Sequence, residues 1–263
     1  ELAAQLIASG KFGQLRMIQA LNYTDFLYRP RRPEELRTEE GGGVLFSQAI
    51  HQIDVVRRLA GGMGEKIYAM TGAWDPKRPT EGAFTALMNF EGGCVANLTY
   101  SGYAHFDSDI WMNDVGELGQ RKLAGAYGDA RRALMDLDPD DEARLKTTRT
   151  FGSGKTVDAK HNEHFGPVIA LCDRADLKLT PDGVEVFGDT ERGFIEVTFG
   201  PAPRRTVNDA LVAAVRQNKA PVQTGAWGLA SLEVCHAILQ SASTGQPVDL
   251  RQQCKTNEEE QTG

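Results

Sequence analysis

The sequence is poor in cysteine, and its few cysteines form no recognisable pair. Cys94, Cys172, Cys235 and Cys254 lie far apart, and none belongs to a Cys-x-x-Cys motif. This spacing argues against a zinc ribbon or a small domain held together by disulfides. The first three lie among apolar residues, so we expect buried, reduced thiols in a cytoplasmic protein.

Long apolar stretches and an excess of positive charge are also absent. No apolar run approaches the length of a membrane helix, and no signal peptide is recognisable. Lys and Arg total 29 against 36 Asp and Glu, which gives a formal net charge of −7. An acidic chain has no general attraction for phosphate backbones or anionic lipids. We therefore expect neither nucleic acid nor membrane as a partner.

A phosphate cradle is missing as well. A dinucleotide-binding turn would show Gly-x-Gly-x-x-Gly after a strand and before a helix. The glycines at 61, 62 and 64 follow a predicted helix, and those at 41–43 follow two glutamates rather than an apolar strand. There is also no P-loop, Gly-x-Ser-x-Gly or His-Glu-x-x-His motif. We expect no cofactor bound to this chain alone.

The start of the sequence favours a truncated or processed chain. Residues 1–9 have the apolar spacing of a helix already under way, without a residue that could cap its start. Residues 256–263 are polar and acidic, which predicts a disordered tail. We therefore expect one substrate-binding and oligomerisation domain over residues 1–255.

Strand patterns fill the middle of the chain, and helical patterns surround them. Runs of alternating or apolar residues separated by turns predict strands, whereas apolar spacing of three and four predicts helices. Strands are expected near 15–23, 67–71, 83–90, 94–101, 110–115, 177–179, 184–187 and 194–197, and helices at 44–59, 207–217 and 225–244. Residues 124–160 predict an irregular or helical insertion.

These elements predict an α+β fold. A large, mostly antiparallel sheet would carry helices on one face. Its other face could stay open to a partner, because an antiparallel sheet does not need its own chain on both sides.

The helix after three glycines carries the most informative side chains. Ser47, His51 and Asp54 are spaced so that an α-helix presents them on one face. Imidazole titrates near neutral pH, so His51 is a candidate general acid or base. The alternative is a helix histidine bonded to a neighbour. For Asp54 we favour a structural role.

This passage resembles the C-terminal domain of the Gfo/Idh/MocA oxidoreductase family, where a glycine-rich turn opens a helix bearing Asp-x-x-x-His and then an acidic motif. His51 and Asp54 match that pattern. Ser47 stands where the family often has Asp, and a serine cannot serve as an ionised carboxylate. Residues 6–13 and 228–248 resemble the family's domain junction and last helix.

The resemblance implies a dihydrodipicolinate-reductase-like sheet domain from a nicotinamide-dependent oxidoreductase. In such a protein His51 would move the proton while hydride passes between the substrate and NAD or NADP. The cofactor would belong to a Rossmann domain that is absent from this chain, so the fragment alone should be inactive. The open sheet face would form a homo-oligomer.

A narrower likeness is to the phthalate dihydrodiol dehydrogenase branch. It rests on residues 28–36, on Ser47-Gln48 ahead of His51, and on the stretches 164–167 and 180–184. This branch implies a small cyclic dihydrodiol as substrate, whereas the wider family also implies sugar-like hydroxyl compounds.

Several further side chains are candidates for lining the substrate pocket. Arg29 and Arg31 could clamp a substrate carboxylate, although the basic loop could equally contact the glutamates beside it or another subunit. The remaining candidates are Gln48 on the helix, His105 after a strand, and His161 and His164, which would share one face of a helix. We expect His236 to be a core residue of the last helix.

Two other functions fit parts of the sequence. One is a non-catalytic binding or assembly module. The other is a metal-dependent hydrolase that uses His51, Asp54, His161 and His164 as ligands.

Overall fold

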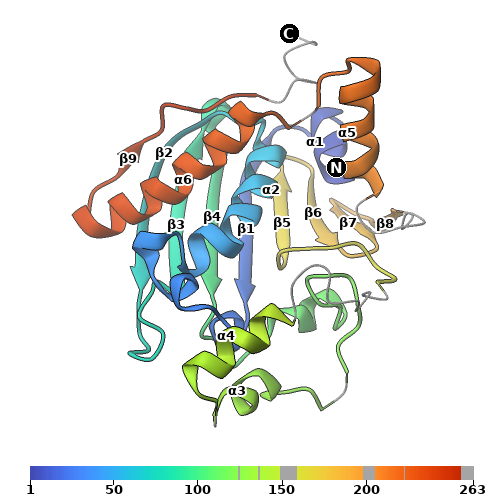
Figure 1. Ribbon diagram of the computed structural model, residues 1–263. Helices are drawn as coiled ribbons and strands as arrows, with labels where there is room; N and C mark the ends of the chain where they lie inside the picture. The colour runs from blue at the N-terminus through green and yellow to red at the C-terminus, as the bar shows by residue number, and fades with distance from the viewer. Residues whose placement is uncertain (124, 136, 149–158, 198–204, 222, 256–263) are drawn as a thin grey trace.

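The computed structural model describes residues 1–123, 125–135, 137–148, 159–197, 205–221 and 223–255. Helices lie across one face of a large sheet (Figure 1). The strands are β1 (Leu15–Tyr23), β2 (Gly64–Gly72), β3 (Ala83–Phe90), β4 (Val95–Ser101), β5 (Val168–Cys172), β6 (Ala175–Thr180), β7 (Gly183–Gly188), β8 (Arg192–Glu196) and β9 (Val248–Asp249). The α-helices are α1 (Leu2–Ala8), α2 (Ile50–Ala60), α3 (Asp129–Leu134), α4 (Pro139–Thr147), α5 (Arg205–Gln217) and α6 (Gly225–Thr244).

The described strands form one nine-stranded sheet in the order β8-β7-β6-β5-β1-β4-β3-β2-β9. β1 lies in its middle and runs parallel to β4, while the other neighbouring pairs are antiparallel. The expected fold, a mostly antiparallel sheet with helices on one face, is therefore confirmed.

Burial alternates along the strands, as a sheet with one covered face requires. On β3, Ala86 and Met88 point into the core, whereas Thr85 and Leu87 are exposed on the opposite face. That opposite face, which we call the open face, also exposes large apolar side chains on neighbouring strands. They are Met17 on β1, Met70 on β2, Val95 on β4 and Ile169 on β5.

A buried arginine connects α2 to α6 on the covered face of the sheet. Arg57 of α2 is fully buried, and its guanidinium lies 4.0 Å from the ring centre of Trp227 at the start of α6. It donates to the Trp227 carbonyl at 3.0 Å and to the Ser231 hydroxyl at 2.8 Å. These bonds satisfy the buried charge and fix α2 relative to α6.

The insertion after β4 contains α3 and α4, which lie beyond one end of the strands (Figure 1). Glu142 of α4 accepts the backbone N–H of Arg31 at 2.8 Å and a guanidinium N–H of Arg78 at 2.7 Å. All three side chains are buried. The contacts hold α4 against the loop that follows β1.

The predicted strand over residues 110–115 is wrong. A 3₁₀ helix, Ser108–Met112, occupies most of this segment. The Asp107 carboxylate caps it by accepting the backbone N–H of Asp109 at 3.1 Å, and Asn113 then adopts a left-handed conformation. Local side-chain to backbone bonding therefore outweighs the apolar pattern of the segment.

None of the helices in the described part of the chain combines the length and the apolar content that a membrane span requires.

Candidate active site

The glycine turn ahead of α2 closes around a buried carboxylate. Gly43 has φ +84°, and a β-carbon on it would overlap the carboxylate of Glu81, so only glycine fits. Glu81 accepts the backbone N–H of Leu45 at 3.2 Å and also the hydroxyl of Thr38. Burial raises the pKa of Glu81. A carboxylate therefore occupies the start of the helical segment, where the helix dipole favours negative charge.

The helical segment begins with a π-turn, Leu45–Ala49, before α2 starts at Ile50. The prediction of one continuous α-helix over residues 44–59 is therefore wrong in its first turn. Ser47 and Gln48 lie within this wider turn, and His51 lies just after it. Such turns occur frequently at functional sites because the extra residue alters which side chains the helix presents.

The His51 side chain is exposed and stacks on an aromatic ring. Its imidazole lies nearly parallel to the ring of Phe165, with the centroids 4.4 Å apart and the planes at 17°. Phe165 belongs to the segment that leads into β5, more than a hundred positions away in the sequence. The candidate acid–base group therefore lies at the surface and contacts an aromatic ring from a distant part of the sequence.

Both ring nitrogens of the neighbouring His164 are occupied. Its Nε2 lies 2.9 Å from the carbonyl oxygen of Val115, and its Nδ1 accepts the backbone N–H of Gly166 at 3.1 Å. These partners assign the proton to Nε2 and leave no nitrogen for a substrate. His164 is 9% exposed, so it acts as an internal fastening of this segment.

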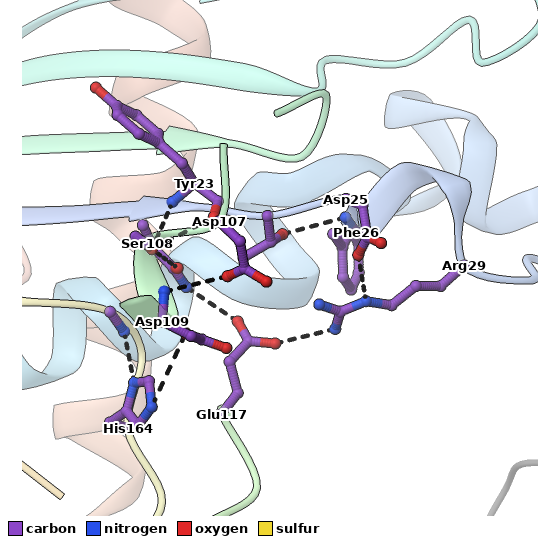
Figure 2. Close-up of polar contacts among 12 residues, drawn as sticks. Tyr23, Asp25, Phe26, Arg29, Asp107, Ser108, Asp109, Glu117 and His164 are labelled. Carbon is purple, nitrogen blue, oxygen red and sulfur yellow. Dashed lines mark hydrogen bonds and ion pairs between the residues drawn. The ribbon is translucent and has the colours of Figure 1, made fainter. Parts of the chain in front are cut away.

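A polar network joins the end of β1 to the segment after β4 (Figure 2). Glu117 accepts the side-chain amide of Asn22 at 2.9 Å and a guanidinium N–H of Arg29 at 3.0 Å. Ser108 donates to Asn22 at 2.9 Å, while Arg29 also binds Asp25 at 3.1 Å. Burial alone would lower the pKa of Arg29, but the carboxylates of Glu117 and Asp25 raise it above its usual range.

Asp109 extends this network towards His164 (Figure 2). It is 1% exposed and pairs with the ammonium of Lys122 at 2.6 Å, and its other oxygen lies 3.9 Å from Nε2 of His164. Lys122 also pairs with Asp107. Burial, with a smaller contribution from Asp107, raises the pKa of Asp109. A single lysine thus bridges two carboxylates behind the His164 segment.

The two arginines expected near a substrate carboxylate differ in exposure. Arg31 lies 3.5 Å from the ring centre of Phe26 and donates to the Phe26 carbonyl at 3.0 Å. Its side chain is 6% exposed, whereas that of Arg29 is 32% exposed. Burial lowers the pKa of Arg31 to about 10. Arg31 is thus held inside the protein, and Arg29 is the one that a small molecule could approach.

The structure separates the remaining candidates. His105 is exposed in the loop after β4. His161 does not share a helix with His164, because residues 159–167 are not helical. Its Nδ1 lies 2.5 Å from Asp182, which lines a cavity of about 390 Å³ with Lys178 and other residues of β6 to β8.

Gln48 is half-buried, and its Oε1 has no hydrogen-bond partner within the described residues.

Asp54 has the structural role that we favoured for it. It accepts the indole N–H of Trp227 and the side-chain amide of Gln223, the latter at 2.7 Å. His236 is not the core residue expected, because its side chain is exposed on α6 and its ring lies 5.1 Å from that of Phe46. The apolar spacing of α6 did not predict which way that position faces.

The proposed ligands of a metal-dependent hydrolase do not gather into one set. Asp54 binds α6, His161 binds Asp182, and His164 binds Val115 and Gly166. Across the residues that the structure describes, no three His, Cys, Asp or Glu side chains are grouped to hold a metal ion.

The glycine turn does not fit a nicotinamide dinucleotide. A pyrophosphate needs free backbone N–H groups and a positive potential at the start of a helix. Here the Glu81 carboxylate accepts the N–H of Leu45, and the backbone carbonyl of Glu81 accepts that of Val44 at 3.1 Å. The negative charge of Glu81 would also repel a phosphate.

Three residues that shape the site were missed by the sequence reasoning. They are Phe165, which belongs to the stretch 164–167, and the two acidic residues Glu81 and Glu117. Glu81 precedes a predicted strand and Glu117 lies in a glycine-bounded turn, and neither context indicates a buried carboxylate. Long-range pairing made these residues important, and no local pattern reports it.

The chain is similar to known proteins along most of its length. Residues 1–121 match the sequence model described as the GFO/IDH/MocA C-terminal domain. The chain is 41% identical over 244 residues to a 1-carboxy-3-chloro-3,4-dihydroxycyclohexa-1,5-diene dehydrogenase of Comamonas testosteroni, with 90% of this chain and 62% of the relative covered.

Two solved structures share the fold. A protein of Bordetella bronchiseptica RB50 described as a dehydrogenase superposes with a TM-score of 0.87 at 40% identity, covering 94% of this chain and 65% of that one. A levoglucosan dehydrogenase in complex with NADH and levoglucosan superposes with a TM-score of 0.63 at 16% identity, covering 95% and 62%. The chain therefore spans less than two thirds of each of these relatives.

Proposed function

Because residues 1–121 match the model of the Gfo/Idh/MocA C-terminal domain, we propose that the complete protein is a nicotinamide-dependent dehydrogenase. Hydride would pass between the cofactor and a hydroxyl-bearing carbon of a small substrate. The observation that carries the proposal is the exposed imidazole of His51, held against Phe165 beside the network at the end of β1. This chain would supply the substrate-binding side of the active site.

His51 would take or return the proton of the reacting hydroxyl group. An imidazole is suited to this step because it exchanges a proton near neutral pH. Ser47 would help to orient the substrate through its hydroxyl group, and Gln48 would flank the pocket. The nicotinamide cofactor, NAD or NADP, would be bound by the part of the protein outside this chain, because the glycine turn around Glu81 does not fit it.

We propose a carboxylated cyclic dihydrodiol as the substrate. The relative from Comamonas testosteroni is named for such a compound, which carries one carboxylate and two vicinal hydroxyl groups. Arg29 is the candidate contact for the carboxylate, because its guanidinium is partly exposed whereas that of Arg31 is buried. Asp25 and Glu117 would hold the Arg29 fork in place.

The open face would join copies of the protein. Met17, Met70, Leu87, Val95 and Ile169 expose apolar surface over neighbouring strands. A monomeric protein seldom exposes several large apolar side chains on one face of a sheet, which favours burial against a second copy.

The test is turnover by the complete protein. Formation of reduced cofactor would be followed by absorbance with carboxylated aromatic cis-dihydrodiols and, separately, with sugars. We expect turnover of the dihydrodiols and a drop of about 10²- to 10⁴-fold in kcat for His51→Ala, the range associated with a general acid–base group. His236→Ala, a change at another exposed histidine, is the control. Wild-type turnover by His51→Ala would refute the catalytic role of His51. Inactivity of the complete protein on both the dihydrodiols and the sugars would refute the proposal that it is a dehydrogenase.

A further inference from the structure

The contact between His51 and Phe165 lies against one face of the imidazole. The planes are only 17° from parallel and the centroids are 4.4 Å apart, so the phenyl ring covers one face of the imidazole. Both nitrogens of an imidazole bond in the plane of the ring. A face-on contact can therefore hold the ring without blocking the direction in which a proton is transferred.

The helix alone does not provide this restraint. His51 lies at the second position of α2 and its side chain is exposed. An exposed side chain samples several rotamers, and the terminal torsion of histidine is broad. An aromatic ring is well suited to favour one orientation of the imidazole, because stacked pairs have a defined geometry.

Phe165 is itself held rigidly on both sides. Before it, His164 is buried and bonded to the Val115 carbonyl. After it, Gly166 has φ +88° and fits so closely against the Leu21 carbonyl and the Asn22 side chain that a β-carbon would overlap them. The Pro167 carbonyl then accepts the N–H of Leu21 at 3.1 Å. The phenyl ring is therefore mounted on the central strand rather than on a free loop.

We infer that Phe165 is a positioning residue that orients the imidazole of His51 for proton transfer. The inference rests on the proposed function, since it gives the orientation a catalytic purpose. Phe165 would act through His51 and would not itself exchange a proton. The segment His164 to Pro167 would thus join the central strand of the sheet to the acid–base group on α2.

The test compares Phe165→Leu, which keeps an apolar side chain but removes the ring, with Phe165→Tyr, which keeps the ring. Both are made in the complete protein, alongside His51→Ala. For Phe165→Leu we expect kcat about 10- to 100-fold lower, because displacement of a catalytic group by about 1 Å can cost 10²-fold. KM should change less than about twofold, because substrate contacts are retained. For Phe165→Tyr we expect a kcat close to that of the wild type, because the ring is kept.

A second readout does not depend on turnover. In protein labelled at the histidine Cε1 position, the resonance that disappears in His51→Ala identifies His51. Stacking on a phenyl ring shifts this proton upfield, so the shift should be lost in Phe165→Leu and retained in Phe165→Tyr. A shift that persists in Phe165→Leu would overturn the stacked arrangement, whatever the activity.

The outcomes separate the two proposals. If His51→Ala loses turnover but Phe165→Leu keeps it, or if both Phe165 variants lose it equally, the positioning role is overturned and the proposed function stands. If His51→Ala keeps turnover, the catalytic role of His51 fails together with this inference. Melting temperatures of both Phe165 variants show whether a loss of kcat reflects unfolding.

Discussion

The carboxylate of Glu81 lies where a β-carbon on Gly43 would have to be. Gly43 adopts φ +84°, and its neighbours Val44 and Leu45 both donate backbone N–H groups to Glu81. The glycine turn is therefore a close-fitting cover over a buried acid. The backbone N–H groups of this turn bind Glu81 and are not available to a phosphate.

Replacement of Gly43 by alanine should destabilise the protein strongly. The change combines a left-handed backbone with a clash against Glu81, and we expect a loss of about 2–4 kcal/mol in the free energy of unfolding. Gly41→Ala is the matched control, because Gly41 has φ +82° but open space around its β-carbon position. It should cost about 1 kcal/mol. Equal losses in urea unfolding would show that Glu81 moves aside freely.

The raised pKa of Glu81 predicts a pH dependence of stability. Burial makes the folded chain hold this proton more tightly than the unfolded chain, whose carboxyl titrates near 4.5. At pH values between the unfolded pKa and the raised folded pKa, the folded state binds more protons than the unfolded state. The free energy of unfolding therefore increases as the pH falls through this range. Glu81→Gln cannot titrate there. The wild type should therefore gain stability relative to Glu81→Gln as the pH falls from neutral towards about 4.5, the value of the unfolded carboxyl.

Denaturant unfolding of both proteins at several pH values measures this difference. A gap that stays constant with pH would mean that Glu81 has its ordinary affinity for protons in the folded protein. If Glu81→Gln instead became more stable relative to the wild type as the pH is lowered, the pKa of Glu81 would be lowered by folding rather than raised.

Substitutions of Asp54 and His51 should have different effects, although the two residues lie only three positions apart on α2. Asp54 should matter mainly for stability and His51 mainly for catalysis. Asp54→Ala removes the acceptor for Trp227 and Gln223 and should cost about 1–3 kcal/mol while leaving kcat largely unchanged. His51→Ala alters an exposed side chain and should cost about 1 kcal/mol or less, while kcat collapses. Thermal unfolding and steady-state kinetics on the same preparations check both. A large loss of kcat in an Asp54→Ala protein that remains stable would show that Asp54 takes part in catalysis.

A charge placed on the open face should disrupt assembly. Leu87 is 58% exposed in the middle of that face, so Leu87→Arg would place an unpaired charge in the proposed contact between copies. Leu123→Arg, at an 81% exposed leucine outside the sheet, is the control. Light scattering after size-exclusion chromatography should show smaller particles for Leu87→Arg alone. The same mass for all three proteins would argue against assembly through this face.

The sheet could be predicted from the sequence because its signals are local. Alternation along β3 and the glycine turn between β3 and β4 are visible within about twenty residues, and so is the helical spacing of α5 and α6. The segment Ser108–Met112 escaped prediction because Asp107 caps a 3₁₀ helix there, against the apolar pattern.

The candidate site was only half visible. His51 could be found from its glycine-opened helix and its family resemblance, and Asp54 could be judged structural. Phe165 could not be connected to His51, because that contact depends on how the chain returns beside β1. The different exposure of Arg29 and Arg31 could not be predicted either, because it depends on how the loop after β1 packs in three dimensions.

The central place of β1 has a consequence for how the protein reaches its native state. Met17 pairs with Val95 on one side, and Leu15 pairs with Cys172 on the other. The second partner is made late during synthesis, so β1 must wait with one edge unpaired while most of the chain emerges from the ribosome. Such long-range closure slows folding and leaves an edge of β1 exposed to wrong partners until β5 has been made.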